Sequence, residues 1–262
     1  MNTLRLFKKQ WKFTALATIG ILLYVVAIIQ LFEMFPRHIQ KGPLPLIVMF
    51  TGIISSVFAY IKFQTKKVDS KIEKLFKTCT LPEYLAFYDT LSFNLEKKEQ
   101  QFRSTISRSM AMFIFGEFDK GMKEIERIDL SEFEPIDKAL HLIAIVIHNY
   151  LQKKDLPLTL ELAKQAKNIA LQYKSYPGIK KTHTTYIVYY TIGKLLNGDF
   201  SAEVLQLLEK SFPKVYFLTR IQIAWALAIA YKKNGLVTKF KEMERYLLVN
   251  APNCKPLHDF EL

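Results

Sequence analysis

The 262-residue chain contains little cysteine, little glycine and few acidic side chains. Two cysteines are too few for a disulfide scaffold or a multi-cysteine zinc module. Nine glycines without a regular period exclude a collagen-like chain. The hydrophobic fraction of 50% excludes a disordered protein, and 24 acidic residues against 37 Lys and Arg give a formal net charge of +13. The composition therefore fits one medium domain, or a small domain with a membrane anchor.

Motifs that carry enzyme chemistry are absent from the sequence. Gly193-Lys194 lacks the upstream glycine and the following Ser or Thr of a phosphate-binding loop, and neither G-x-S-x-G nor H-E-x-x-H occurs. Cys79 is expected in the core and Cys254 in an exposed tail. His141 and His148 lie seven residues apart, without a third ligand at helical spacing. We therefore expect no catalytic residue, no metal and no cofactor; an enzyme would need a site assembled only in space.

Two long uncharged runs stand near the start of the chain. Residues 13–32 and 42–61 each contain 20 residues without a charge. At about 1.5 Å of rise per residue, such a helix crosses a hydrocarbon core of roughly 30 Å. The pattern predicts a transmembrane helix over 13–33, a short external loop over 34–43 and a second transmembrane helix over 44–63.

Most of the positive charge flanks these two runs. Residues 1–77 carry 12 basic and three acidic side chains, and the bases concentrate in the N-terminal segment 1–12 and the stalk 64–80, which is expected to continue the second helix. Because basic flanks stay inside, we expect a two-span cell-membrane protein with both termini cytoplasmic. Membrane lipid is then the expected partner of this charge, and no nucleic acid is expected. The predicted head-group contacts are Lys8, Lys9, Lys12, Lys62, Lys66 and Lys67.

Small residues share one face of the second predicted span. Gly52, Ser55, Ser56 and Ala59 recur at helical spacing, which lets two helix backbones approach closely. This face is predicted to pack against another membrane helix. The first span of the same chain and a different membrane protein are both open as partners. Separately, the chain is a possible homo-oligomer.

From residue 81 to 262 the pattern is that of a helical cytoplasmic domain. Amphipathic stretches alternate with turn formers such as Gly116, Gly198 and Asn234-Gly235, and no strand pattern is bounded by hairpin turns. Asp155 before Pro157 is typical of a helix start. Helices are predicted over 81–97, 99–115, 118–129, 136–153, 157–173, 179–197, 201–211, 215–233 and 236–250.

The breaks between these helices recur at a nearly regular distance. Gly116, Lys154, Gly198 and Gly235 are separated by 38, 44 and 37 residues. A period in this range is typical of paired-helix repeats, in which each pair covers its apolar face with its neighbours.

The repeated segments resemble the tetratricopeptide-repeat family over roughly residues 99–252. In the last unit Leu227-Ala228 match the large-small pair of helix A, Tyr231 the following aromatic and Asn234-Gly235 the turn, while Glu244 departs from a usually aromatic position. The segments 116–118 and 198–200 resemble the family's Gly-Asp-Tyr turn. The expected fold is therefore all-α: a transmembrane helical hairpin followed by an antiparallel helix-pair solenoid similar to these repeats.

The resemblance implies a groove that binds a peptide or protein segment. In that family, helix A of each unit lines the groove. Carried onto this chain, the groove residues are Arg103, Met110, His141, Ile145, His148, Thr185, Tyr189, Gln222, Trp225 and Lys232.

The expected function is that of a membrane-anchored adaptor or scaffold with a protein or peptide partner. The alternative is a ligand- or peptide-responsive regulatory or immunity-type subunit of a membrane complex, acting through its transmembrane helices. Charge along the domain is uneven, since residues 117–137 are mainly acidic and 153–181 mainly basic. Such runs are usually solvated faces, although they also suit self-association or the steering of a partner. The abundant Lys, Ile and Phe are typical of a bacterial protein.

Overall fold

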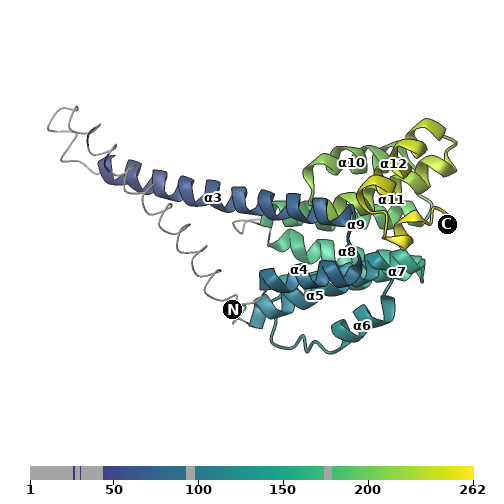
Figure 1. Cartoon of the computed structure of the whole chain (residues 1–262), viewed down its shortest axis with the longest axis horizontal. Coiled ribbons are helices and arrows are strands. Elements are labelled where there is room, and N and C mark those ends of the chain that lie inside the picture. Colours follow the sequence, from purple (N-terminus) through teal and green to yellow (C-terminus); the bar gives the residue numbers. More distant parts are fainter. Residues whose placement is uncertain (1–25, 27–29, 31–43, 93–97, 174–178) are drawn as a thin grey trace. The chain divides into compact units, whose positions relative to one another are not determined.

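A computed structural model describes residues 26, 30, 44–92, 98–173 and 179–262, and the regular elements within them are all helices (Figure 1). The all-α class predicted from the sequence is therefore confirmed for these residues. The chain divides into two compact units, Met1–Val68 and Asp69–Leu262. Nearly all of the predicted segments 1–12, 13–33 and 34–43 lie outside the described residues, and so do Lys8, Lys9 and Lys12.

Helix α3 (Leu44–Phe76) is a single helix over the predicted second span and most of the predicted stalk. Pro45 stands in its first turn, where a missing N–H costs little. In the parts of the chain whose residues are described, no helix has both the length and the hydropathy that crossing a membrane requires. Ser55, Ala59, Lys66 and Lys67 are exposed and Gly52 is half-buried, while the side chains of Ser56 and Lys62 lie outside the described residues.

The second unit consists of helices whose ends follow the turn formers of the sequence. Gly116, Gly198 and Gly235 have φ angles of 92°, 91° and 68°, a backbone that favours glycine and stops a helix. Asp155 caps the next helix, accepting a hydrogen bond from the Leu158 N–H at 3.2 Å. The helices are α4 (Leu81–Ser92), α5 (Lys98–Phe115), α6 (Phe118–Glu126), α7 (Pro135–Gln152), α8 (Leu156–Gln172), α9 (Ile179–Leu196), α10 (Ala202–Ser211), α11 (Phe217–Lys233) and α12 (Val237–Asn250), with the short 3₁₀ helices η1 (Phe212–Lys214) and η2 (Lys255–His258).

Within this unit consecutive helices pack against one another. α5 packs on α6, α7 on α8, α9 on α10 and α11 on α12 (Figure 1). The first helices of successive pairs also touch: α5 contacts α7, α7 contacts α9 and α9 contacts α11. The contact of α9 with α7 is close enough that a Cβ on Gly193 would lie 2.0 Å from the Tyr150 hydroxyl oxygen.

Helix α11 is buried on every face. All residues from Ile221 to Tyr231 are buried, and apart from Gln222 they are apolar, as expected for a helix inside a core. It contacts α9, α10, α12, η1 and η2. The last helix pair of the stack therefore contributes its first helix to the core.

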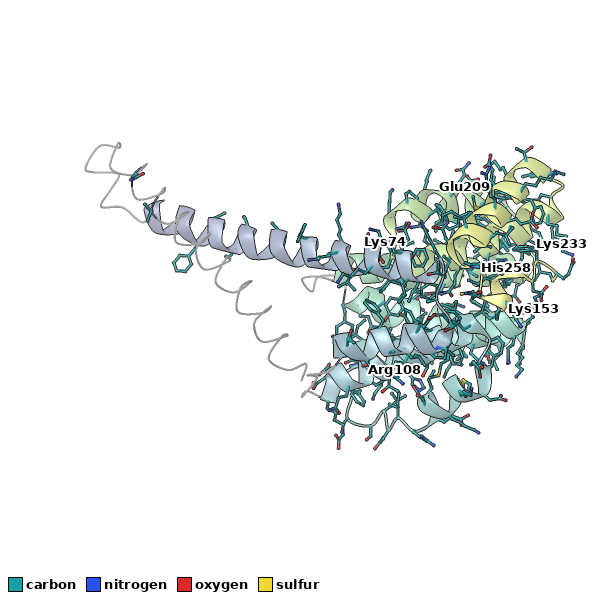
Figure 2. All side chains as sticks on the ribbon, in the orientation of Figure 1. Lys74, Arg108, Lys153, Glu209, Lys233 and His258 are labelled. Atoms are coloured by element: carbon teal, nitrogen blue, oxygen red, sulfur yellow. The ribbon has the colours of Figure 1, made fainter. Side chains whose placement is uncertain are left out.

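The C-terminal segment, residues 251–262, folds back onto the stack. Cys254 and Leu257 are fully buried, and η2 contacts α5, α7, α11 and α12. Figure 2 labels His258 in this segment and Lys153 at the end of α7. Lys153 Nζ lies 2.7 Å from a carboxylate oxygen of Asp259. The exposed tail predicted around Cys254 is wrong, because this segment contacts both the first and the last helix pairs.

The end of α3 belongs to the second unit, which begins at Asp69 and not at residue 81 as predicted. The Phe217 N–H, at the start of α11, donates to Asp69 Oδ1 at 2.9 Å. Arg220 places guanidinium nitrogens 3.9 Å from Asp69 and 3.6 Å from Glu73. We call this group of Asp69, Glu73, Phe217 and Arg220 the α3–α11 clasp. Next to it Phe76 is fully buried, with its ring 5.4 Å from the Phe217 ring.

Candidate binding cleft

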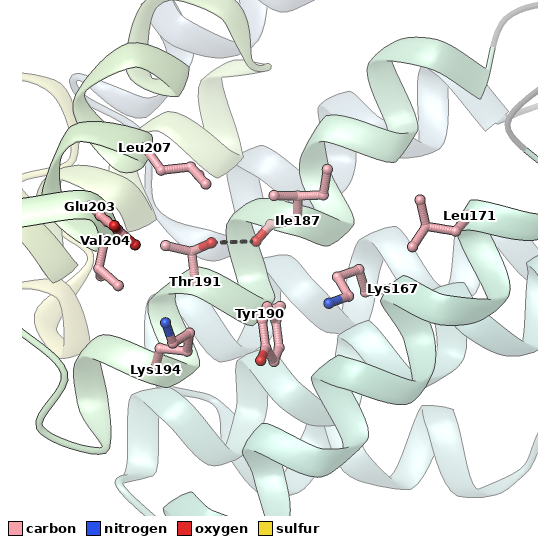
Figure 3. A pocket seen from close by; sticks show the side chains of 9 residues that line it. All are labelled: Lys167, Leu171, Ile187, Tyr190, Thr191, Lys194, Glu203, Val204 and Leu207. Atoms are coloured by element: carbon pink, nitrogen blue, oxygen red, sulfur yellow. Dashed lines mark hydrogen bonds between the residues drawn. The ribbon is translucent and has the colours of Figure 1, made fainter. Parts of the chain in front are cut away.

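A cleft of about 340 Å³ lies between α8 and α10, with α9 as its floor (Figure 3). This volume is at the lower end of the range for sites that bind small ligands or side chains. Its lining residues are Lys167 and Leu171 from α8, Ile187, Tyr190, Thr191 and Lys194 from α9, and Glu203, Val204 and Leu207 from α10.

One end of the cleft is basic. Lys167 Nζ lies 3.9 Å from the centroid of the Tyr190 ring, a cation–π contact. Within the described residues Lys167 forms no ion pair. Lys194 Nζ lies 2.7 Å from a carboxylate oxygen of Asp199. This hydrogen bond raises the pKa of Lys194 and lowers the pKa of Asp199 to about 2, so both groups are charged at neutral pH.

The other end of the cleft is apolar. Leu171 is 41% exposed, Ile187 and Leu207 are half-buried, and Val204 is buried. The Thr191 hydroxyl donates to the Ile187 carbonyl oxygen at 2.8 Å, so its hydrogen is used within α9 (Figure 3). Glu203 is exposed on the α10 wall.

This lining offers charge and apolar surface more than reactive groups. None of the nine residues is a His or Cys, and the pKa shift of Lys194 moves away from neutrality. A general acid or base works best with a pKa near the operating pH, and a nucleophile needs an adjacent base. The chemistry that this arrangement supports is the binding of an anionic group beside an apolar one.

Four of the ten groove residues predicted from the resemblance lie in the core. His148, Tyr189, Gln222 and Trp225 are all less than 9% exposed. The Trp225 indole N–H donates to the Asp259 carbonyl oxygen at 2.9 Å. Burial raises the pKa of Tyr189 to about 12, although hydrogen bonds with Thr219 and Gln222 oppose the shift. These four side chains are therefore packed inside the unit and not exposed on a groove surface.

The other six are engaged between neighbouring elements or half-buried. Arg103 forms an ion pair with Asp137 of α7 at 2.9 Å, and Lys232 forms one with Glu261 of the C-terminal segment. The remaining four, all half-buried, are Met110, His141, Ile145 and Thr185. None of these six lines the cleft.

The two histidines singled out by the sequence lie among packed side chains of the second unit. His148 Nδ1 is 2.9 Å from the Asn149 side-chain oxygen, and its ring packs edge-on against Phe113. Burial lowers the pKa of both His141 and His148, so each favours its neutral form. Among the described residues, no three His, Cys, Asp or Glu side chains are grouped as a metal ion would require.

Sequence reasoning missed the cleft entirely. Its lining residues lie on α8, α9 and α10, and the resemblance to tetratricopeptide repeats singles out none of them, because on α9 it selects Thr185 and Tyr189 instead. One pattern pointed to it: the basic run over 153–181 includes Lys167. That run was interpreted by default as a solvated face, which gave no reason to single out one lysine.

Comparisons with known proteins give no match to this chain. No family model, no curated protein and no solved structure matches it. Its function is therefore inferred from its own residues.

Proposed function

We propose that this protein is a membrane-anchored adaptor that binds a segment of a partner protein in the cleft between α8 and α10. The observation that carries the proposal is the cleft itself, an open space of about 340 Å³ in a stack of helix pairs. Beside its apolar wall stands Lys167, which forms no ion pair with any described residue. Stacked helix pairs commonly serve as binding surfaces, because their shape presents several helices at once. The role proposed is binding without catalysis.

The membrane anchor rests on the sequence. Residues 13–33 and 44–63 are the proposed spans, with residues 34–43 outside and both termini in the cytoplasm. The runs 13–32 and 42–61 carry no charge, while lysines flank them on the proposed inner side. Lipid head groups attract such lysines by about 1 kcal/mol each. The small residues of α3 are proposed to pack against another membrane helix.

The proposed solenoid differs from the family that it resembles in where it binds. The contacts between successive first helices support a solenoid similar to tetratricopeptide repeats. In that family the first helices line the binding groove. Here the first helix of the last pair, α11, is buried, and η2 covers ends of the stack. The binding site is accordingly proposed on the opposite side of α9.

Site-specific photo-crosslinking in cells tests the adaptor. The full chain carries benzoylphenylalanine at Leu207 in the cleft, or at the exposed Glu242 on α12 as the control. The proposal expects a discrete crosslinked product from position 207 and none from position 242. The same products from both positions, or none from either, contradict it.

Membrane anchoring has its own test. The full chain is expected to stay in the membrane pellet after an alkaline carbonate wash, whereas a chain that begins at residue 64 is expected in the supernatant. Release of the full chain by carbonate would argue against the two spans.

The α3–α11 clasp favours a second function, regulation of a membrane complex through α3. Asp69 and Glu73 connect the last turns of α3 to the start of the buried helix α11. A change in α3 would then reach the core. If so, the variant D69N/E73Q speeds the reaction of the buried thiols Cys79 and Cys254 with a maleimide. Unchanged labelling rates, with the same melting temperature, would leave the adaptor as the better account.

A further inference from the structure

The two ends of the cleft between α8 and α10 differ in charge. Figure 3 shows Lys167 and Lys194 on either side of Tyr190, while Leu207 and Ile187 lie away from both amino groups. The cleft thus places a cationic end next to an apolar end within about 340 Å³.

We propose that this cleft recognises an acidic peptide segment in which an Asp or Glu neighbours a branched apolar residue. The carboxylate lies between Lys167 and Lys194, and the apolar side chain lies against Ile187 and Leu207. The proposal rests on the adaptor function above and specifies the chemistry of its partner.

The state of the two lysines is the reason to expect a carboxylate. An ammonium group carries three N–H donors, and the contact with the Tyr190 ring engages one side of Lys167. Since Lys167 forms no ion pair within the described residues, a carboxylate gains a charge-assisted hydrogen bond there without displacing a competitor. Lys194 is already paired with Asp199, but both side chains are more than 30% exposed, and such pairs are weak. Lys194 therefore adds attraction while Lys167 makes the decisive contact.

The apolar end favours a peptide over a simple anion. Leu171, which is 41% exposed, and the half-buried Ile187 and Leu207 gain from covering their surface with another apolar side chain. A phosphate or a nucleic acid would leave these apolar side chains exposed to water. A polyanion would also meet the carboxylates of Glu203 and Asp199 close to the cleft. Glu203 further orients the peptide, because it repels a carboxylate from the α10 wall.

The test measures peptide affinity with the full chain in lipid nanodiscs. The probe is a fluorescein-labelled octapeptide with alternating Leu and Asp, and its twin carries Asn in place of every Asp. Fluorescence anisotropy is expected to show binding of the acidic probe and at least about tenfold weaker binding of the twin, the usual effect of removing a hydrogen bond to a charged group.

Two lysines one turn apart on α8 supply the variant and its control. Lys167→Met is expected to weaken the acidic probe about tenfold and to leave the twin within about twofold, while Lys167→Arg keeps the preference for the acidic probe. Lys164→Met removes an exposed lysine that is paired with Glu161 and is expected to change neither affinity more than about twofold. Equal melting temperatures of the variants confirm that each is folded.

Three results would overturn the inference. The first is equal binding of the two probes, and the second is equal effects of Lys164→Met and Lys167→Met. The third concerns dodecanoate as an additional probe: its binding, with binding of neither peptide, would indicate a lipid-like carboxylate as the ligand. If crosslinking from position 207 persists in cells despite any of these, the chemistry assigned to the partner is wrong and the adaptor stands. If position 207 also gives no crosslink, both proposals fail.

Discussion

The two sides of α9 differ in what covers them. On one side Gly193 packs against Tyr150 of α7, and Tyr189 bonds to Thr219 and Gln222 of α11. On the other side Ile187, Tyr190 and Lys194 border the cleft. We call these the closed side and the open side of α9. One helix therefore serves both as a core element and as the floor of a site. Packing on the closed side fixes the position of the residues that border the cleft on the open side.

The largest effect is expected from a cavity behind the closed side. Trp225→Ala removes a fully buried indole and its hydrogen bond to Asp259, and is expected to lower the free energy of unfolding by about 3–5 kcal/mol. Leu207→Ala at the open side is expected to cost less than about 1 kcal/mol, since its side chain is half-buried. Denaturant unfolding of both variants makes the comparison. Similar losses would mean that the two sides do not differ in packing.

A methyl group on the closed side is expected to have the next largest effect. In Gly193→Ala the new Cβ would lie 2.0 Å from the Tyr150 oxygen and 3.0 Å from a Leu160 methyl carbon, so the buried Tyr150 side chain or the surrounding helices must shift. Overpacking of this kind costs about 1–3 kcal/mol, measurable as a lower melting temperature. Gln206→Ala, at an exposed position of α10, is the control and is expected to stay within about 0.5 kcal/mol. A harmless Gly193→Ala would show that the helix contact is looser than described.

The α3–α11 clasp connects the end of α3 to α11, the helix that packs against the closed side of α9. Arg220→Met leaves Asp69 and Glu73 without the cation that contacts both, and none of the three side chains is more than 34% exposed. A loss of about 1–2 kcal/mol in unfolding free energy is expected. The exposed pair of Lys239 with Glu209 supplies the control, because Lys239→Met is expected to cost less than about 1 kcal/mol. An equal loss of unfolding free energy in the two variants would show that the clasp stabilises the protein no more than an exposed ion pair does.

The smallest effect concerns pH and two histidines of α7, the helix that packs against the closed side of α9. Burial holds the pKa of His141 and His148 below that of an exposed histidine, so the unfolded chain binds more protons between the two values. This contribution to stability is present above the unfolded pKa of about 6.5 and is lost as the pH falls below it. Unfolding curves from pH 7.5 to 5.5 should show the decline. The decline should be shallower in the variant H141Q/H148Q; an unchanged slope would contradict this assignment.

The helices of the second unit could be predicted from the sequence because local chemistry fixes where they end. Gly116, Gly198 and Gly235 stop helices by their backbone conformation, and Asp155 starts one with its side chain. The closing contacts could not be predicted in this way. Asp69 and the Phe217 N–H are 148 residues apart, and Lys153 and Asp259 are 106 apart. Their partners follow from the packing of the whole unit.

The cleft escaped prediction for a related reason. Lys167 lies over the Tyr190 ring and has no carboxylate partner among the described residues, whereas Lys164 is paired with Glu161. Neither fact is visible in the chain order. The resemblance to tetratricopeptide repeats predicted a groove on the first helices. It did not predict that α11 would be buried on all faces.

Open arrays of helix pairs gain or lose units easily, since each unit depends only on its neighbours. Here the C-terminal segment touches α5 at the beginning of the array and α12 at its end. Inserting or deleting one pair would separate these attachment points and open the centre of the unit to water. The contacts of the C-terminal segment thus fix the number of helix pairs in the array. Variation between related chains should therefore fall in side chains and turns, while the number of pairs stays constant.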